Sequence, residues 1–143
     1  MRSAINLSKY IINKCIDEDC PISNLQLQKI LYYIQKEFLK FDNIAFYDVI
    51  EAWRFGPVVP DVYYCFCGAG SMPISTHYND VDMHDYTPFE LEDIDEIVNS
   101  KRILSPWTMV EETHKEGGAW DLVFKKGSGN KKEIPIDLIK KVG

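Results

Sequence analysis

The chain has 143 residues, of which 45% are hydrophobic and 27% are charged, as in an ordinary soluble globular protein. This length favours a single domain over residues 1–143, with a core that needs neither disulfides nor a structural metal. The net charge of -6 makes nucleic-acid binding unlikely, because such a protein needs a basic face to meet phosphate.

Charge is unevenly distributed along the chain. Residues 77–96 contain eight acids and no Lys or Arg, whereas residues 125–141 contain six lysines and only two acids. Two solvated faces are the simpler explanation. The alternative is an acidic patch that docks a basic partner protein.

The sequence contains no recognisable signal peptide and no membrane-spanning segment. The N-terminus alternates polar and apolar residues, and no run approaches the roughly 18 apolar residues that a membrane helix needs. We therefore expect a cytoplasmic protein. Its cysteines should be reduced thiols, and they are Cys15, Cys20, Cys65 and Cys67.

The first half of the chain predicts two helices. Apolar residues recur at helical spacing from residue 3 to about 17. The second helix, over about 23–41, begins with a capping box formed by Ser23 and Gln26. Its apolar stripe predicts a central packing element and consists of Leu27, Ile30, Leu31, Ile34, Phe38 and Phe41. Lys29 falls largely off this stripe, and Tyr32 and Tyr33 lie at its edge.

A strand, a break and a helix start are expected next. Residues 49–55 alternate around β-favouring side chains, so Trp53 and Phe55 should share one strand face and Arg54 the other. Gly56 and Pro57 should then end the strand in a tight turn. Pro60 suits the first position of a short third helix, which carries Tyr63.

The second half predicts a loop followed by short helices. Residues 74–86 have no clear period, and Thr87 with Glu90 forms a second capping box. Ser105 and Pro106 open a fifth helix to about residue 114, with Trp107 and Val110 inward. Residues 120–124 fit either a short strand or a helical turn, and Ile134 leads into a last short helix.

Together these elements predict an α+β domain that is mainly α. Five to six helices should surround the central helix at about 23–41, with a small β-hairpin or sheet beside it.

Plain enzymatic or metal chemistry has little support. Cys65 and Cys67 are one residue too close for the usual zinc pair, and no second pair follows. No spacing singles out a cysteine–histidine nucleophile pair, and His114 fits a helix C-cap or a core histidine. We therefore expect no catalytic residues, no metal and no cofactor, and place a cysteine or metal enzyme third among the possible functions.

A DNA-binding transcriptional regulator of a prophage or mobile element is the main alternative. The first two helices could form a helix-turn-helix, with the second as the recognition helix. That helix offers only Lys29, Lys36 and Lys40 and has no arginine.

Three segments resemble the Panacea domain family. Residues 22–33 are similar to its "ISNLKLQKLLYYAQ" pattern, and residues 51–63 are similar to its central "EAWRYGPVVPEVY". Residues 113–116, with Trp120 downstream, resemble its "THxExPW" element. The family usually has proline directly before that tryptophan. Here residues 117–119 intervene, so the local turn must differ and any role carried over to Trp120 is in question.

The resemblance implies a non-enzymatic function. The family includes SocA-like antitoxins and GepA-like phage-associated proteins, whose genes often lie in prophages or mobile elements. Such antitoxins bind and neutralise a partner toxin, and the SocA type is a proteolytic adaptor that delivers its toxin to a ClpXP protease. The implied partners are therefore a protein toxin and a ClpXP-type protease, without a membrane.

The same motifs supply candidate partner-binding residues. Arg54, Tyr32, Tyr33 and His114 are expected on an exposed polar-aromatic surface. Trp53, Phe55 and Tyr63 are better explained as core, and only their exposed fraction would meet a toxin. The full candidate set, with Gly56 and Pro57 as the motif turn, is Tyr32, Tyr33, Trp53, Arg54, Phe55, Tyr63, His114 and Trp120.

Overall fold

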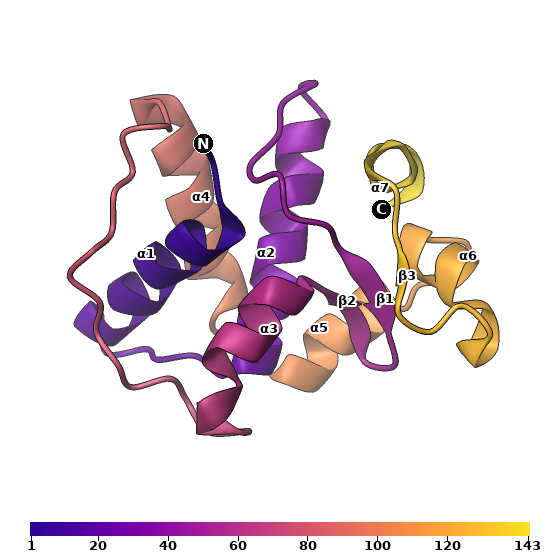
Figure 1. The fold of residues 1–143 in the computed structure, drawn as a ribbon, viewed down its shortest axis with the longest axis horizontal. Coiled ribbons are helices and arrows are strands. Elements are labelled where there is room, and N and C mark those ends of the chain that lie inside the picture. The colour runs from indigo at the N-terminus through magenta and orange to yellow at the C-terminus, as the bar shows by residue number, and fades with distance from the viewer.

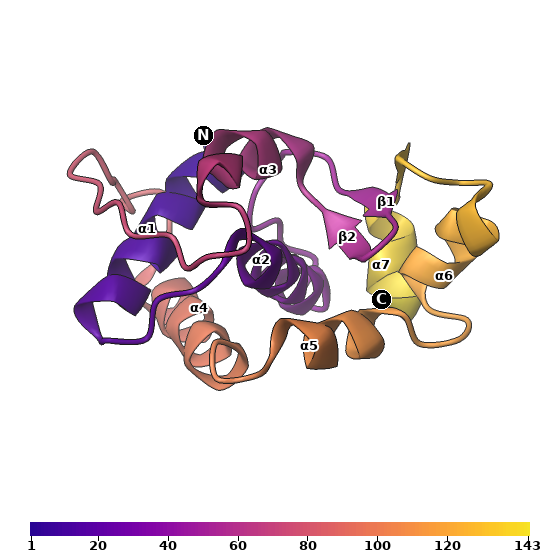
Figure 2. The ribbon, with the colours of Figure 1, turned by 90° about the horizontal axis from the view of Figure 1, so that it is seen from below.

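Helix α2 (Asn24–Leu39) is the centre of the fold. The computed structural model describes all residues from 1 to 143. Figure 2 shows α2 almost end-on and surrounded by other elements. Those elements are α1 (Ala4–Asp17), α3 (Pro60–Phe66), α4 (Pro88–Lys101), α5 (Pro106–Thr113), α7 (Ile136–Val142) and a small sheet. Helix α6 (Ala119–Phe124) lies beyond the sheet. The α+β, mainly α prediction is confirmed, with seven α-helices rather than five or six.

The predicted start of α2 is confirmed by its cap. The Gln26 backbone N–H donates to the Ser23 hydroxyl at 3.2 Å, and the Ser23 backbone N–H donates to the Gln26 side-chain oxygen at 2.9 Å. The apolar stripe from Leu27 to Phe38 is buried. The helix ends at Leu39 rather than 41, so Phe41 leaves the helical period. It is 74% exposed, and its predicted place in the core was wrong.

The predicted small sheet is confirmed, but its strands have different boundaries. Its strands β1 (Glu51–Trp53), β2 (Gly56–Val58) and β3 (Lys132–Glu133) are antiparallel in the order β2-β1-β3 (Figure 1). Gly56 and Pro57 therefore begin a second strand instead of ending the first. Because β2 is an edge strand, the missing N–H of Pro57 is tolerated there. Arg54 and Phe55 form the turn, so Phe55 does not share a strand face with Trp53.

Helices α3, α4 and α5 begin where the prolines predicted. Pro60, Pro88 and Pro106 each occupy a first-turn position. Thr87 and Glu90 form the second capping box. The side-chain directions in α5 were predicted only in part. Met109 and Val110 are buried, but Trp107, which was predicted to point inward, is 58% exposed. The open choice for residues 120–124 is resolved as helix α6.

The irregular segment before α4 runs along the outer side of α1 (Figure 1). Asn13 holds it in place, because its side chain donates to the Tyr78 carbonyl at 2.6 Å and accepts from the Tyr78 N–H at 2.8 Å. Arg2 pairs with Glu90 at 2.6 Å and Lys9 with Asp80 at 2.8 Å. Part of the acidic run is thus neutralised within the molecule, which leaves fewer free carboxylates for a basic partner. None of the helices combines the length and apolarity needed to cross a bilayer.

Candidate protein-docking face

Three distant sequence segments meet at Lys29, inside the protein. The Lys29 Nζ donates a hydrogen bond to the Pro57 carbonyl oxygen at 3.0 Å, and the residue is 0% exposed. A Cβ at Gly56 would lie 2.9 Å from both the Lys29 Cε and the Thr113 Oγ1, and Gly56 has a φ of +110°. Only glycine fits both the backbone conformation and the space.

The burial of Lys29 corrects its predicted place off the apolar stripe. β2 and α5 both pack on α2, and the amine is enclosed against β2. Burial lowers the pKa of Lys29 to about 7, because a low-dielectric environment disfavours the charged form.

A second anchor holds the hairpin from the side of α6. Trp120 is 7% exposed, and its indole N–H donates to the Trp53 carbonyl at 2.7 Å. The Trp120 ring stacks on His114, with ring centroids 3.6 Å apart. The local turn that differs from the family pattern contains Gly117, which has a φ of +76° and donates its N–H to Asp121 at 3.0 Å. Trp120 therefore supports the hairpin from inside.

His114 is the C-cap of α5. A helix C-cap is one of the two structural roles that the sequence predicts for it. Burial, followed by the positive charge of Lys29, lowers the pKa of His114. Its Nε2 is buried and has no hydrogen-bond partner. The side chain therefore acts as a neutral stacking partner for Trp120 and does not belong to an exposed surface.

Above these anchors lies a group of partly exposed aromatic side chains, here called the aromatic face. Its members are Trp53, Phe55, Tyr63, Tyr64 and Trp107. Phe55 is 44% exposed, Tyr64 60% and Trp107 58%, while Trp53 and Tyr63 are half-buried. The Phe55 ring meets Trp107 edge-on at 5.4 Å, and Trp53 meets Tyr63 at 5.0 Å. The expectation that Phe55 belongs to the core was wrong, because it occupies the hairpin turn.

The two aromatic pairs border one hollow. Its volume is about 280 Å³, and Phe55, Val58 and Tyr63 are among its lining residues. Gln28 lies buried beneath and accepts from the Val59 N–H at 2.9 Å, while Asn24 donates to the Tyr63 carbonyl at 3.1 Å. These bonds tie the start of α3 to α2, so the aromatic face stands on a fixed base.

Two cations lie at the edge of the aromatic face. Arg54 is exposed at the hairpin tip, with its guanidinium 5.3 Å from the centre of the Phe55 ring, and no carboxylate pairs with it. The Lys131 ammonium lies 5.0 Å from the centre of the Trp53 ring. Glu51, which lies on β1 with Trp53, accepts a hydrogen bond from the Trp53 indole N–H at 2.9 Å. Exposed aromatics with adjacent arginine are the residue types enriched at protein–protein interfaces.

The structure separates the predicted site residues into three groups. Trp53, Arg54, Phe55 and Tyr63 come together on the aromatic face, while His114 and Trp120 support it from within. Tyr32 and Tyr33 belong to neither group. Tyr32 is 3% exposed, so its predicted exposure was wrong. The Tyr33 hydroxyl donates to Glu112, and the Lys101 ammonium lies 4.1 Å from the Tyr33 ring centre.

The prediction missed Tyr64 and Trp107. The sequence predicts that Trp107 points inward from the fifth helix, but it is 58% exposed. A usable signal was its place directly after Pro106, at the exposed start of a short helix. Tyr64 follows Tyr63 in α3, and successive helical residues point in different directions.

No three His, Cys, Asp or Glu side chains come close enough to hold a metal ion. Cys67 and Ser71 also line the hollow in the aromatic face, but no histidine does. All four cysteines are free thiols.

Comparison with known proteins identifies the family of this chain. Residues 27–121 match the family described as "Antitoxin SocA-like, Panacea domain", so the chain belongs to this antitoxin family. Among curated proteins, Antitoxin SocA from Caulobacter vibrioides (strain NA1000 / CB15N) is 30% identical over 153 aligned positions, which cover 95% of this chain and 77% of that protein. No solved structure matches the chain.

Proposed function

We propose that this protein is an antitoxin that binds and neutralises a protein toxin through the aromatic face. Membership of the antitoxin family supports the toxin as partner. The observation that supports this surface is a hollow lined by Phe55 and Tyr63. Their ring neighbours Trp107 and Tyr64 are 58% and 60% exposed. Aromatic side chains bury a large area at low entropic cost, and they dominate the binding energy of many interfaces.

The supports beneath the face fit this role. Lys29 and Trp120 each hold a carbonyl of the hairpin, those of Pro57 and Trp53. A hairpin that is ordered before binding loses less conformational entropy when the partner arrives. The family motif thus builds the support, and the side chains at the turn meet the toxin.

The experiment is co-expression with the product of the adjacent open reading frame, on a phage or mobile element where the gene is expected to lie. Expression of that neighbour alone should arrest growth, and this protein should restore it. The two proteins should co-purify. Absence of both rescue and complex with any adjacent product would contradict the proposal.

We further propose that the bound toxin is delivered to a ClpXP-type protease. The similarity to the protein named Antitoxin SocA supports an antitoxin role. Delivery to a protease is an additional step that we propose beyond that role. The test is the rate of toxin degradation by purified protease, with and without this protein. Equal rates would leave neutralisation by binding alone.

The structure argues against α2 as a DNA recognition helix. The helix is surrounded by other elements (Figure 2), and Lys29 is fully buried. A recognition helix must present its side chains to the major groove, which α2 does not do.

A further inference from the structure

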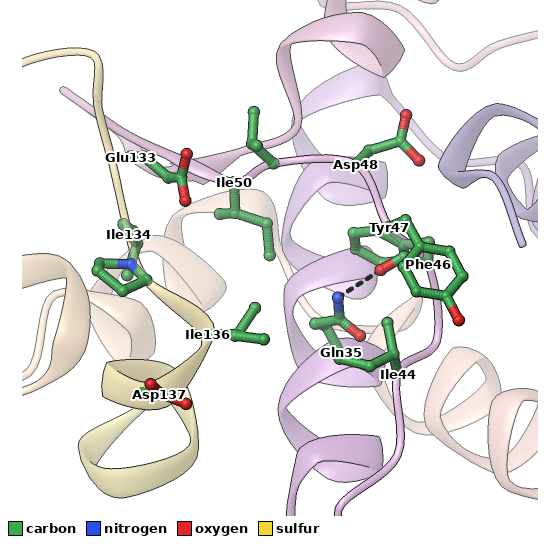
Figure 3. A pocket seen from close by; sticks show the side chains of 12 residues that line it. Gln35, Ile44, Phe46, Tyr47, Asp48, Ile50, Glu133, Ile134, Ile136 and Asp137 are labelled. Atoms are coloured by element: carbon green, nitrogen blue, oxygen red, sulfur yellow. Dashed lines mark hydrogen bonds between the residues drawn. The ribbon is translucent and has the colours of Figure 1, made fainter.

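A second hollow lies away from the aromatic face, between α2, residues 44–50 and the start of α7 (Figure 3). Its volume is about 280 Å³. Buried Phe46, Ile50 and Ile134 contribute to its lining, whereas Tyr47, Val49 and Ile136 are 66%, 48% and 46% exposed. It therefore combines an apolar floor with apolar lips that water still reaches.

The walls of this hollow are fixed by hydrogen bonds. The Gln35 side chain donates to the Phe46 carbonyl at 2.8 Å (Figure 3). It also accepts from the Ala45 N–H at 2.8 Å. Across the hollow, the Ile134 N–H donates to the Ile50 carbonyl at 2.8 Å. Because both walls are tied to the core, the hollow exists before any ligand enters.

The lining of the hollow contains three carboxylates and no Lys or Arg, and Lys131, Lys132, Lys140 and Lys141 lie near it in sequence but outside the lining. Glu133 and Asp137 are exposed lining residues, and neither takes part in a salt bridge. Asp48 lies on the opposite wall and accepts from the Ala4 N–H at 2.8 Å. Glu133 also stands directly opposite Glu51 across β1 and β3. Like charges in this position destabilise a sheet, and a cation from another molecule would relieve them.

We infer that this hollow docks a peptide segment in which an aliphatic side chain is flanked by lysine or arginine. The aliphatic side chain would enter between Ile136 and Val49, and the flanking cations would meet Glu133 and Asp137. The hollow is smaller than most pockets that enclose a complete small-molecule ligand, but it can hold one or two apolar side chains. Charge complementarity selects a basic partner over a neutral one.

The probe is the synthetic peptide Gly-Ser-Lys-Lys-Leu-Lys-Lys-Ser-Gly, titrated into the isotope-labelled full chain and followed by amide NMR shifts. We expect shifts that saturate at residues 44–50 and 133–137 and leave the aromatic face unchanged. Replacing the leucine of the peptide by serine should weaken binding at least about tenfold, the value of one buried leucine. Higher ionic strength should weaken it further.

Matched variants test the carboxylates. Glu133→Gln with Asp137→Asn should weaken peptide binding at least about threefold. The control, Glu92→Gln with Glu96→Gln, removes the same charge from exposed sites on α4 and should leave binding unchanged. If both double variants weakened peptide binding equally, the effect would come from net charge alone, and the inference would be overturned.

Two other results would also overturn it. Equal binding of the serine peptide would show that the hollow takes no apolar side chain. Shifts at residues 44–50 that grow with protein concentration in the absence of peptide would assign the hollow to a second copy of this chain.

Discussion

The Nζ of Lys29 lies 3.0 Å from the carbonyl oxygen of Pro57, in a position that water does not reach. This bond joins the central helix to the edge strand of the hairpin. It also explains why Gly56, directly before Pro57, has no room for a side chain. The following predictions test this anchor, its neighbours and the face that they support.

Lys29→Met should change how stability depends on pH. Burial lowers the pKa of Lys29 from 10.5 to about 7 in the folded protein. Between these values the unfolded chain binds the proton and the folded protein does not, so the wild type gains stability as pH rises above about 7. The gain has an upper limit of about 1.4 kcal/mol per pH unit.

The measurement is the free energy of unfolding of both proteins from about pH 6 to pH 9, a window that spans the lowered value. The difference between wild type and variant isolates Lys29 from other groups that titrate in this range. Below the folded-state pKa the difference should level off. Parallel curves across the whole range would show that Lys29 keeps its ordinary pKa.

Gly56→Ala should destabilise the fold more than Gly127→Ala. Both glycines have a φ of +110°, but a Cβ at position 127 meets nothing within 4 Å. Gly127→Ala therefore costs only backbone strain, about 1–3 kcal/mol. Gly56→Ala adds the collision with Lys29 and Thr113 and should cost at least about 1 kcal/mol more. Thermal or denaturant unfolding measures the stability of the two variants. Equal losses of stability would show that the collision with Lys29 and Thr113 does not contribute.

Trp120→Phe should lower stability by about 1–3 kcal/mol, because the Trp53 carbonyl loses its donor while an aromatic ring remains to stack on His114. Trp107→Phe is the matched control, since the exposed Trp107 indole N–H donates no hydrogen bond within the protein. It should leave the unfolding midpoint unchanged. If both variants lost similar stability, the smaller ring would explain the effect, and the lost hydrogen bond would not.

Phe55→Ala and Trp107→Ala should each weaken the toxin complex at least about tenfold, as expected for exposed aromatics at the centre of an interface. Their unfolding midpoints should change less than that of a core variant, because the two residues are 44% and 58% exposed. Phe89→Ala is the control, since Phe89 is 79% exposed at the start of α4. Calorimetry with the purified toxin measures the affinities. Undiminished binding by both variants would place the interface elsewhere.

The features that local sequence determines were predictable. Serine or threonine caps and first-turn prolines located the starts of α2, α4 and α5, because those signals act within one helical turn. The stripe from Leu27 to Phe38 identified the central helix, since its period is a property of the helix itself.

The remaining features depend on which elements come together. The pattern around Lys29 could not show that its amine is enclosed against β2, since that depends on packing between distant segments. Trp107 faces outward because α5 packs on α2 and buries Met109 and Val110 instead. The strand boundary was misplaced because a glycine and a proline are acceptable in an edge strand as well as in a turn.

The enclosure around Lys29 also has a consequence for synthesis. Its parts come from α2, from Gly56 and Pro57, and from Thr113 at the end of α5. A ribosome releases these parts in that order, so a nascent chain cannot complete the enclosure until Thr113 has emerged. A prematurely terminated product would keep the hairpin residues but lack their support. The aromatic face therefore cannot rest on its complete support before residue 113 has been translated.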